Sequence, residues 1–357
     1  MRKSFTAVLV IPTGIGAVIG GYAGDALPIA RAIATVVDCL ITHPNVLNGA
    51  NLYWSDPTIQ YVEGYALDQF ARGNWHLRPS HGNKIGVILD SDIPADLHLR
   101  HLQVIAGAQA TLGLDILPAL TTPQGLGVKL NLSAQGASWG TIAAPQVLLS
   151  STAKLIDCGA EAIAVVSWVP DCFSDPLYGR QIEQYRQGQG VDILAGVEAV
   201  ISHLITREFH IPCAHAPALT PLPLKADISP RAVAEELGFT FLPCVLVGLH
   251  QAPQLVSRNT TFPQANDLTP EMVNVVISPH SACGGSGLLS LLAYPQIKLI
   301  TIQENKTTLS VTPESLNIPP SRVIAVKNYL EAIGVISALK AGINWRSLIV
   351  CGCAQAL

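Results

Sequence analysis

The segment from Ser278 to Gly287 places a thiol, an imidazole and several glycines between an apolar run and a helix-like stretch. Cys283 is expected at or just before the helix N-terminus, where the helix end favours the thiolate. His280, three residues earlier, is placed to act as its base or to orient a substrate. The small residues that would offer donors to an oxyanion or phosphate are Ser281, Gly284, Gly285 and Ser286. A Gly-rich anion turn with a bystander cysteine is the alternative interpretation.

A second Gly-rich turn, beginning at Pro12, lies directly after the first apolar run and before a helix. Glycines there let the backbone approach a ligand, and helix N-termini favour anions. The candidate ligand-binding residues are Thr13, Gly14, Gly16, Gly20 and Gly21. This spacing is not G-x-G-x-x-G, and no acidic residue ends the second strand, so no NAD fingerprint is present. A tight strand-to-helix turn without a ligand is the alternative.

Polar side chains also follow the second expected strand, at the carboxyl edge where open α/β sheets bind ligands. His43, Asn45 and Asn48 offer several donors and acceptors there, although Asn-rich segments are also common turns. Near the C-terminus, Glu304 and Asn305 close another expected strand. The two Gly-rich turns, with a polar strand end after the second, resemble nucleotide-sugar glycosyltransferases, which implies a nucleotide-binding alternative.

Histidines recur near expected strand and helix ends. His203, His215 and His250, together with His280, would suit zinc or iron if they converged, but no H-x-x-x-H or H-x-H spacing links them. A hydrogen-bonded structural histidine is the alternative for each. For acid–base work the best-placed carboxylates are Glu198, five residues before a histidine, and Asp171, which follows an expected strand.

These residues must be positioned by βαβ units, because Val- and Ile-rich runs alternate with helix-period stretches along the chain. The expected strands are residues 7–12, 39–42, 85–90, 116–121, 162–167, 211–214, 240–247, 273–278 and 298–303. The expected helices are residues 25–37, 95–112, 145–158, 194–207, 229–237, a stretch from 286, and 329–341. We therefore predict an α/β fold with two Rossmann-like lobes, in which mostly parallel sheets are flanked by helices.

The chain has 357 residues, more than one core usually serves, and its composition shifts at a Pro-rich stretch after Pro217. The predicted lobes are residues 1–217 and 218–357, with the last helix free to pack back on the first lobe. The apolar N-terminal run behind Arg2 and Lys3 has the outline of a signal peptide, but its glycines and the helix expected next favour a first strand and turn.

The composition excludes several classes of partner. A net charge of −4 without a basic run argues against nucleic acid, and no uninterrupted apolar stretch predicts a membrane-spanning helix. Charged residues make up only 13%, about half the usual share, which favours compact packing and leaves room for a homo-oligomer. Most of the 8 cysteines sit in apolar contexts, which favours reduced thiols and the cytoplasm.

Three stretches carry a family resemblance: residues 190–203, residues 214–218, and residues 303–313 taken with 328–332. They resemble an uncharacterised family found mainly in cyanobacteria and plastid-bearing plants. The resemblance spans nearly the whole chain and implies a cytoplasmic or stromal protein, without supplying a reaction.

Taken together, the residues favour an enzyme that binds a small phosphorylated or carboxylated metabolite between the lobes, with Cys283 and His280 at its centre. The alternatives are a glycosyltransferase-like nucleotide binder, a metal-dependent hydrolase or lyase, and a non-catalytic metabolite-binding protein.

Overall fold

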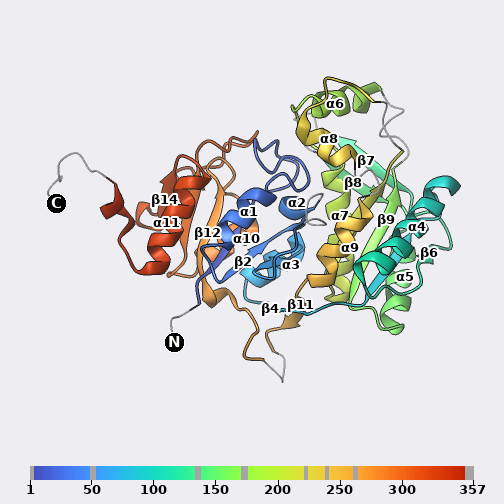
Figure 1. Cartoon of the computed structure of the whole chain (residues 1–357), viewed down its shortest axis with the longest axis horizontal. Helices are drawn as coiled ribbons and strands as arrows, with labels where there is room; N and C mark the ends of the chain where they lie inside the picture. Colours follow the sequence, from blue (N-terminus) through green and yellow to red (C-terminus); the bar gives the residue numbers. More distant parts are fainter. Residues whose placement is uncertain are drawn as a thin grey trace.

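A computed structural model describes residues 4–48, 54–132, 138–169, 176–220, 224–237, 241–259 and 264–349. The larger of its two main sheets is six-stranded and parallel, in the order β14-β13-β12-β1-β2-β3. Its strands are β1 (Thr6–Leu9), β2 (Cys39–Thr42), β3 (Ile59–Tyr61), β12 (Val273–Pro279), β13 (Lys298–Ile302) and β14 (Val323–Val326). Strands from both ends of the chain therefore share one sheet, drawn in blue and in orange to red in Figure 1.

The middle of the chain forms a second parallel sheet, in the order β10-β9-β5-β6. Its strands are β5 (Ile85–Leu89), β6 (Leu120–Thr121), β9 (Ala162–Trp168) and β10 (Cys213–Ala218). Two short antiparallel pairs complete the strands: β4 (Trp75–Arg78) with β11 (Gln254–Ser257), and β7 (Val128–Leu132) with β8 (Ser138–Ile142). The predicted fold class, α/β with parallel sheets flanked by helices, is confirmed.

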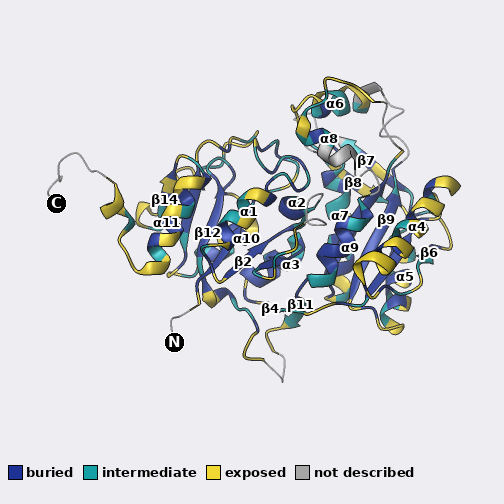
Figure 2. Ribbon diagram, viewed as in Figure 1, coloured by how far each residue is buried: buried dark blue, intermediate teal, exposed yellow. Residues whose placement is uncertain are grey.

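Helices cover both faces of the six-stranded sheet, as the alternation of side chains along β1 requires. Ala7 and Leu9 pack with helices α1 (Leu27–Ala34) and α11 (Tyr329–Ala341). Val8, on the opposite face, packs with α3 (Gly64–Ala71) and α10 (Ser286–Leu292). All four strand residues of β1 are buried, which explains their apolar character (Figure 2).

The second sheet is sandwiched in the same way. Val87 and Leu89 of β5 face α4 (Ala95–Leu112) and α9 (Leu242–Gln251), while Ile88 faces α5 (Pro145–Asp157) and α7 (Ala195–Phe209). The remaining helices are α2 (Pro44–Leu47), α6 (Pro176–Arg186), α8 (Pro230–Leu237) and the 3-10 turns Pro270–Met272, Pro320–Arg322 and Trp345–Leu348. No helix in the described ranges is both long enough and apolar enough to cross a membrane.

The strand expected at residues 240–247 is wrong, because this segment lies within and just before helix α9. Seven α9 residues, from Leu242 to Leu249, are buried, since the helix packs against the second sheet and also against β3. A helix buried on all sides has a continuous apolar sequence, which periodicity alone does not distinguish from a buried strand.

The division expected at residue 217 does not follow the sheets. β1 pairs with β12 in parallel, so the first and last parts of the chain build one sheet and residues 85–218 build the other. One hydrophobic cluster also runs through both sheets, including Leu9, Leu89 and Leu246. Helix α11 packs against α1, where Lys340 donates a hydrogen bond to Asp38 at 2.8 Å.

Because β1 has β12 on one side and β2 on the other, the order of the six-stranded sheet reverses beside it. Loops after strands on the two sides of such a point leave in opposite directions, which opens a crevice outside the carboxyl ends of the strands. The loops after β1 and β12 are therefore the ones that flank this crevice, and the loops after β2 and β3 lie at the same carboxyl edge on the β1 side.

We predict that Leu9→Ala lowers the free energy of unfolding by about 2–5 kcal/mol, because Leu9 is fully buried in the central strand. The matched control is Leu330→Ala on α11, whose side chain is 79% exposed and which should change stability by less than about 0.5 kcal/mol. Urea unfolding followed by circular dichroism measures both. Equal effects of the two substitutions would contradict the placement of β1.

Candidate functional site

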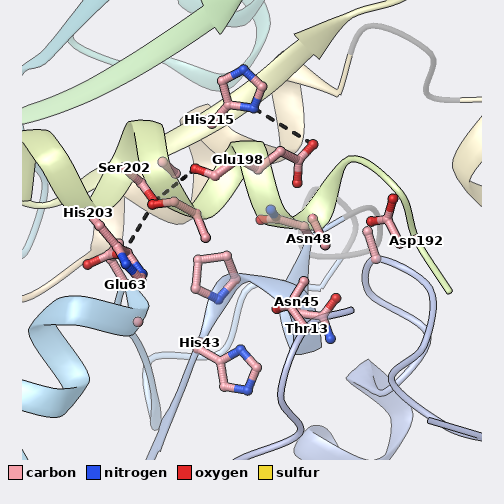
Figure 3. Close-up of a pocket in the computed structure, with 16 residues that line it drawn as sticks. Thr13, His43, Asn45, Asn48, Glu63, Asp192, Glu198, Ser202, His203 and His215 are labelled. Atoms are coloured by element: carbon pink, nitrogen blue, oxygen red, sulfur yellow. Dashed lines mark hydrogen bonds and ion pairs between the residues drawn. The ribbon is translucent and has the colours of Figure 1, made fainter. Parts of the chain in front are cut away.

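A cavity of about 120 Å³ lies between the two sheets, where loops after β1, β2 and β3 meet helix α7 and strand β10. Its polar lining residues are Thr13, His43, Asn45, Asn48, Glu63, Asp192, Glu198, Ser202, His203 and His215 (Figure 3). The position is the carboxyl edge of a parallel sheet, as expected for ligand sites in open α/β folds. Several candidates that lie far apart in the sequence therefore meet in one place.

His215 is a buried side chain of the cavity lining. It projects from β10, and its Nε2 lies 2.7 Å from the hydroxyl of Ser167 on the neighbouring strand β9. The side chain is only 1% exposed, yet its Nδ1 has no hydrogen-bond partner among the described residues. The nearest charged atom is Oε1 of Glu198, at 3.7 Å. A buried ring nitrogen without a partner costs free energy, which a bound ligand could recover.

Two carboxylates stand at the start of helix α7. Oδ1 of Asp192 accepts a hydrogen bond from the Leu194 backbone N–H at 2.9 Å, and Glu198 occupies the first turn. Burial, and next the negative charge of Glu198, raise the pKa of Asp192 to about 7, although backbone hydrogen bonds act in the opposite direction. A carboxyl group with a pKa near 7 is present in both its protonated and its ionised form at neutral pH.

Glu63 joins the two walls of the cavity. One of its oxygens caps α3 by accepting from the backbone N–H groups of Tyr65 and Ala66. The other accepts from Nε2 of His203 on α7 at 2.9 Å, and the hydroxyl of Ser202 also donates to it. Burial disfavours the charged ring of His203, but the hydrogen bond and the charge of Glu63 prevail, so the pKa of His203 is raised.

His43, Asn45 and Asn48 follow β2 and line the cavity. Nε2 of His43 accepts the backbone N–H of Ile11 at 3.0 Å, and burial lowers the pKa of His43 to about 4, so the ring is neutral. Nδ2 of Asn45 donates to the Gly20 carbonyl at 2.6 Å. Oδ1 of Asn48 accepts from the Tyr61 hydroxyl at 2.8 Å. These contacts show that His43, Asn45 and Asn48 also fix the shape of the loops around the cavity.

The Gly-rich turn after β1 is shaped mainly by the chain itself. Gly14, Gly16 and Gly20 have φ of 73°, 60° and 85°, in the region that favours glycine, and a Cβ on Gly21 would lie 2.3 Å from the Ala17 carbonyl oxygen. Asn305 clamps this turn by bonding both the N–H and the carbonyl of Ile19. Of the predicted ligand-binding residues in the turn, Thr13 lines the cavity.

The turn after β12 does not present an activated thiol. Cys283 has no exposed surface, and burial raises the pKa of its thiol to about 12. Its backbone N–H donates to Val311, within a segment that covers the turn. His280 is held by Thr301 at 3.1 Å and by Glu314 at 3.5 Å. Helix-end stabilisation was expected to dominate at Cys283, but burial outweighs it.

The remaining residues of that turn also bond to the protein. Ser281 pairs with Thr307 at 2.8 Å, and Ser286 donates to Asp68. Gly284 and Gly285 lead into α10, with Gly285 as its N-cap. Glu304 is exposed and pairs with Lys327 at 3.6 Å. None of these side chains is among the described residues that line the cavity.

The histidines expected to share a metal do not all meet. His203 and His215 line the cavity, whereas His250 lies near the end of α9, beside Gly82. Among the described residues, no group of three or more His, Cys, Asp or Glu side chains is placed to hold a metal ion. Asp171, the other predicted acid–base carboxylate, lies outside the described residues.

Sequence reasoning missed three cavity residues, Glu63, Asp192 and Ser202, and also Ser167 behind His215. Glu63 lies two residues after the end of β3, a three-residue strand too short to be predicted, so its place at a strand's carboxyl edge was hidden. Asp192 stands two residues before Leu194, the N-cap of α7, and an acidic residue just before an expected helix is a signal that could have identified it.

Two comparisons show strong similarity to known sequences. Residues 6–349 match a family described as "Protein of unknown function (DUF3326)". The chain is also 54% identical over 344 residues to an uncharacterised lipoprotein of a Synechococcus species, a match that covers 96% of this chain and 93% of the relative. The predicted resemblance to an uncharacterised cyanobacterial family is confirmed.

A comparison with solved structures found a nucleotide-free acetone carboxylase. The match has 12% sequence identity and a TM-score of 0.19, and it covers 52% of this chain and 23% of that chain. Similarity at this level does not bear on the fold or the chemistry of this protein.

We predict that Cys283 resists alkylation in the native protein, whereas Cys158 reacts. Cys283 is buried with a pKa raised to about 12, so it presents almost no thiolate at neutral pH, while Cys158 is exposed at the end of α5. Iodoacetamide labelling mapped by mass spectrometry measures both thiols, with urea-unfolded protein as the control in which both should react. Faster labelling of Cys283 than of Cys158 at neutral pH would restore the thiolate hypothesis.

Proposed function

Because the chain belongs to the DUF3326 family, described as proteins of unknown function, we propose from its site alone that it is an enzyme. The proposed reaction class is general acid–base chemistry on a small polar metabolite bound between the two sheets. The observation that carries this proposal is the buried Nδ1 of His215, a residue that lines the cavity, because this atom has no hydrogen-bond partner among the described residues.

The surroundings of His215 support a proton-transfer role. Ser167 fixes Nε2, so the ring keeps one orientation while Nδ1 stays available to a ligand. Asp192, with a pKa raised to about 7 by burial and by Glu198, can both donate and accept a proton near neutral pH. A group whose pKa lies near the working pH is the most effective general acid or base. His215 and Asp192 are therefore the proposed catalytic residues, and Glu198 tunes Asp192.

The Ser167, His215 and Glu198 side chains form a series that resembles a nucleophilic triad, with distances of 2.7 Å and 3.7 Å. Ser167 is fully buried and is not among the described residues that line the cavity. An attacking hydroxyl must reach its substrate, so this geometry favours a serine that orients the histidine over a serine nucleophile.

The size of the cavity favours a small ligand. Sites for drug-sized molecules usually measure roughly 300–1,000 Å³, whereas this cavity measures about 120 Å³. A small metabolite fits this volume better than a nucleotide sugar does, which weighs against the glycosyltransferase-like alternative. The expected anionic ligand also loses support, because Glu63, Asp192 and Glu198 bring negative charge to the cavity.

We predict that Asp192→Asn and His215→Gln each reduce turnover by about 10²–10⁴-fold, since each removes a proton-transfer group. The assay incubates the full chain in D₂O with panels of small polyols, hydroxy acids and amines, and follows turnover or deuterium incorporation by NMR. Glu208→Gln, an exposed carboxylate on the same helix, and His81→Gln, an exposed histidine, are the matched controls.

The same experiment includes a direct measurement of the Asp192 carboxyl by ¹³C NMR titration. Its pKa should lie near 7 and should fall in Glu198→Gln, because the raising effect of the Glu198 charge is removed. Proton donation by Asp192 is then lost as the pH rises through about 7. An ordinary carboxyl pKa for Asp192, or turnover that survives both substitutions in folded protein, would end the proposal.

We also propose that the protein is cytoplasmic. The free thiols among the described residues support a reducing compartment: Cys39, Cys158, Cys213, Cys244 and Cys283. The Synechococcus relative is instead called a lipoprotein, and the same property in this chain would associate it with a membrane.

Fractionation of a cyanobacterial host that expresses the full chain tests the location. We expect the protein in the cytosolic fraction, with an intact mass that shows no acyl group. Recovery in the membrane fraction with added acyl mass would contradict the cytoplasmic proposal and would leave the acid–base site unaffected.

A further inference from the structure

The charge of the cavity lining is negative and lacks a matching basic side chain. Three carboxylates line it, and no Lys or Arg is among the described lining residues. Outside the described ranges, Lys and Arg occur only within residues 1–3, since the other undescribed segments contain neither type. Among the described lining residues, the histidines are therefore the only side chains that can supply a positive charge to the cavity.

The three carboxylates differ in how far neighbouring protein groups neutralise their negative charge. Glu63 has His203 at 2.9 Å and two backbone N–H groups of α3. Glu198 has, among the described residues, only the ring of His215 at 3.7 Å as an ion-pair partner. Asp192 is held by backbone N–H groups at the start of α7. The uncompensated charge therefore lies at Asp192 and Glu198, next to His215.

We infer that the substrates of this site are small organic cations carrying a primary ammonium group, an inference that rests on the acid–base function proposed above. An ammonium has three N–H donors and no acceptor. The corner formed by Asp192, Glu198 and His215 offers two carboxylates and one ring nitrogen whose hydrogen bond is unmade. One ammonium group between Glu198 and Nδ1 of His215, which lie 3.7 Å apart, would bond both and neutralise part of the excess charge.

Two observations favour an ammonium over other cations. The described residues place no group of His, Cys, Asp and Glu side chains in the geometry that a metal ion needs. Nδ1 of His215 is an acceptor when Nε2 carries the ring proton and donates it to the Ser167 hydroxyl. That tautomer suits a ligand with N–H donors, and the volume of about 120 Å³ suits a short chain attached to the nitrogen.

Three compounds of nearly equal size separate the charge classes: ethanolamine, ethylene glycol and glycolate, which are cationic, neutral and anionic. Binding to the full chain is measured by NMR shifts of the labelled His215 ring as each compound is titrated at about pH 8. We expect ethanolamine to bind at least about tenfold more tightly than the other two. In Glu198→Gln this preference should fall below about threefold, whereas Glu208→Gln, altered outside the cavity, should retain it.

The affinity for ethanolamine should rise about tenfold between about pH 6 and about pH 8, because Asp192 ionises through a pKa of about 7 while an alkyl ammonium stays protonated. The other titratable groups of the lining are His43, Glu63, Glu198, His203 and His215. Deprotonation of His203 would act in the same direction. Asp192→Asn separates the two contributions, since this variant should lose most of the pH dependence.

Glycolate binding as tightly as ethanolamine, or a His215 ring unmoved by ethanolamine at about 100 mM, overturns the ammonium inference. Either result leaves the acid–base proposal standing if the carboxyl of Asp192 titrates near 7 in the free protein. An ordinary pKa for Asp192 removes the acid–base proposal whatever the ligand preference. The two failures are therefore distinguishable within one set of samples.

Discussion

The carboxylate of Glu63 is the interaction on which the geometry of the cavity depends. It caps α3, which follows the last strand on one side of the six-stranded sheet, and it holds His203 of α7, which covers the other sheet. Gly64 permits this contact, because a Cβ there would lie 3.1 Å from Nε2 of His203. A single buried carboxylate thus fixes the distance between the two walls.

On the other side, α7 is fixed by backbone contact with the hairpin β7–β8. A Cβ on Gly196 would lie 2.4 Å from the Ser138 carbonyl oxygen, and one on Gly140 would lie 2.4 Å from Val197. Glycines on both partners therefore let the helix approach the strand closely. With α7 held by β8 and by Glu63, the carboxylates at its N-terminus have fixed positions relative to His215 on β10. Glu198 and His215 are thus carried by a helix and a strand, which hold side chains more precisely than loops do, whereas Asp192 precedes the helix.

The sequence predicted the alternation of strands and helices because each buried strand of a parallel sheet has a continuous apolar run. It could not reveal that β1 pairs with β12, since contacts between distant segments leave no local pattern. The same limit applied to the site: His43 and His215 were each recognised, but their meeting depends on how the sheets face each other. The prediction of a reactive thiol at Cys283 failed for the opposite reason. The local sequence was typical of a thiolate at a helix N-terminus, and only the tertiary structure shows that the side chain is buried.

The charge distribution at the start of α7 is costly for folding. A helix N-terminus favours negative charge, so one carboxylate there would be stabilised. At α7, burial and the neighbouring charge of Glu198 instead raise the pKa of Asp192 to about 7, so the ionised form of Asp192 is disfavoured. The unpartnered Nδ1 of His215 adds a second unfavourable feature within the same cavity. Replacing such groups by apolar side chains would often be neutral or stabilising. Buried polar atoms without a hydrogen-bond partner also occur away from the cavity, as at Gln60 and His250. Two carboxylates and such a histidine nitrogen at one cavity are nevertheless consistent with a requirement of function.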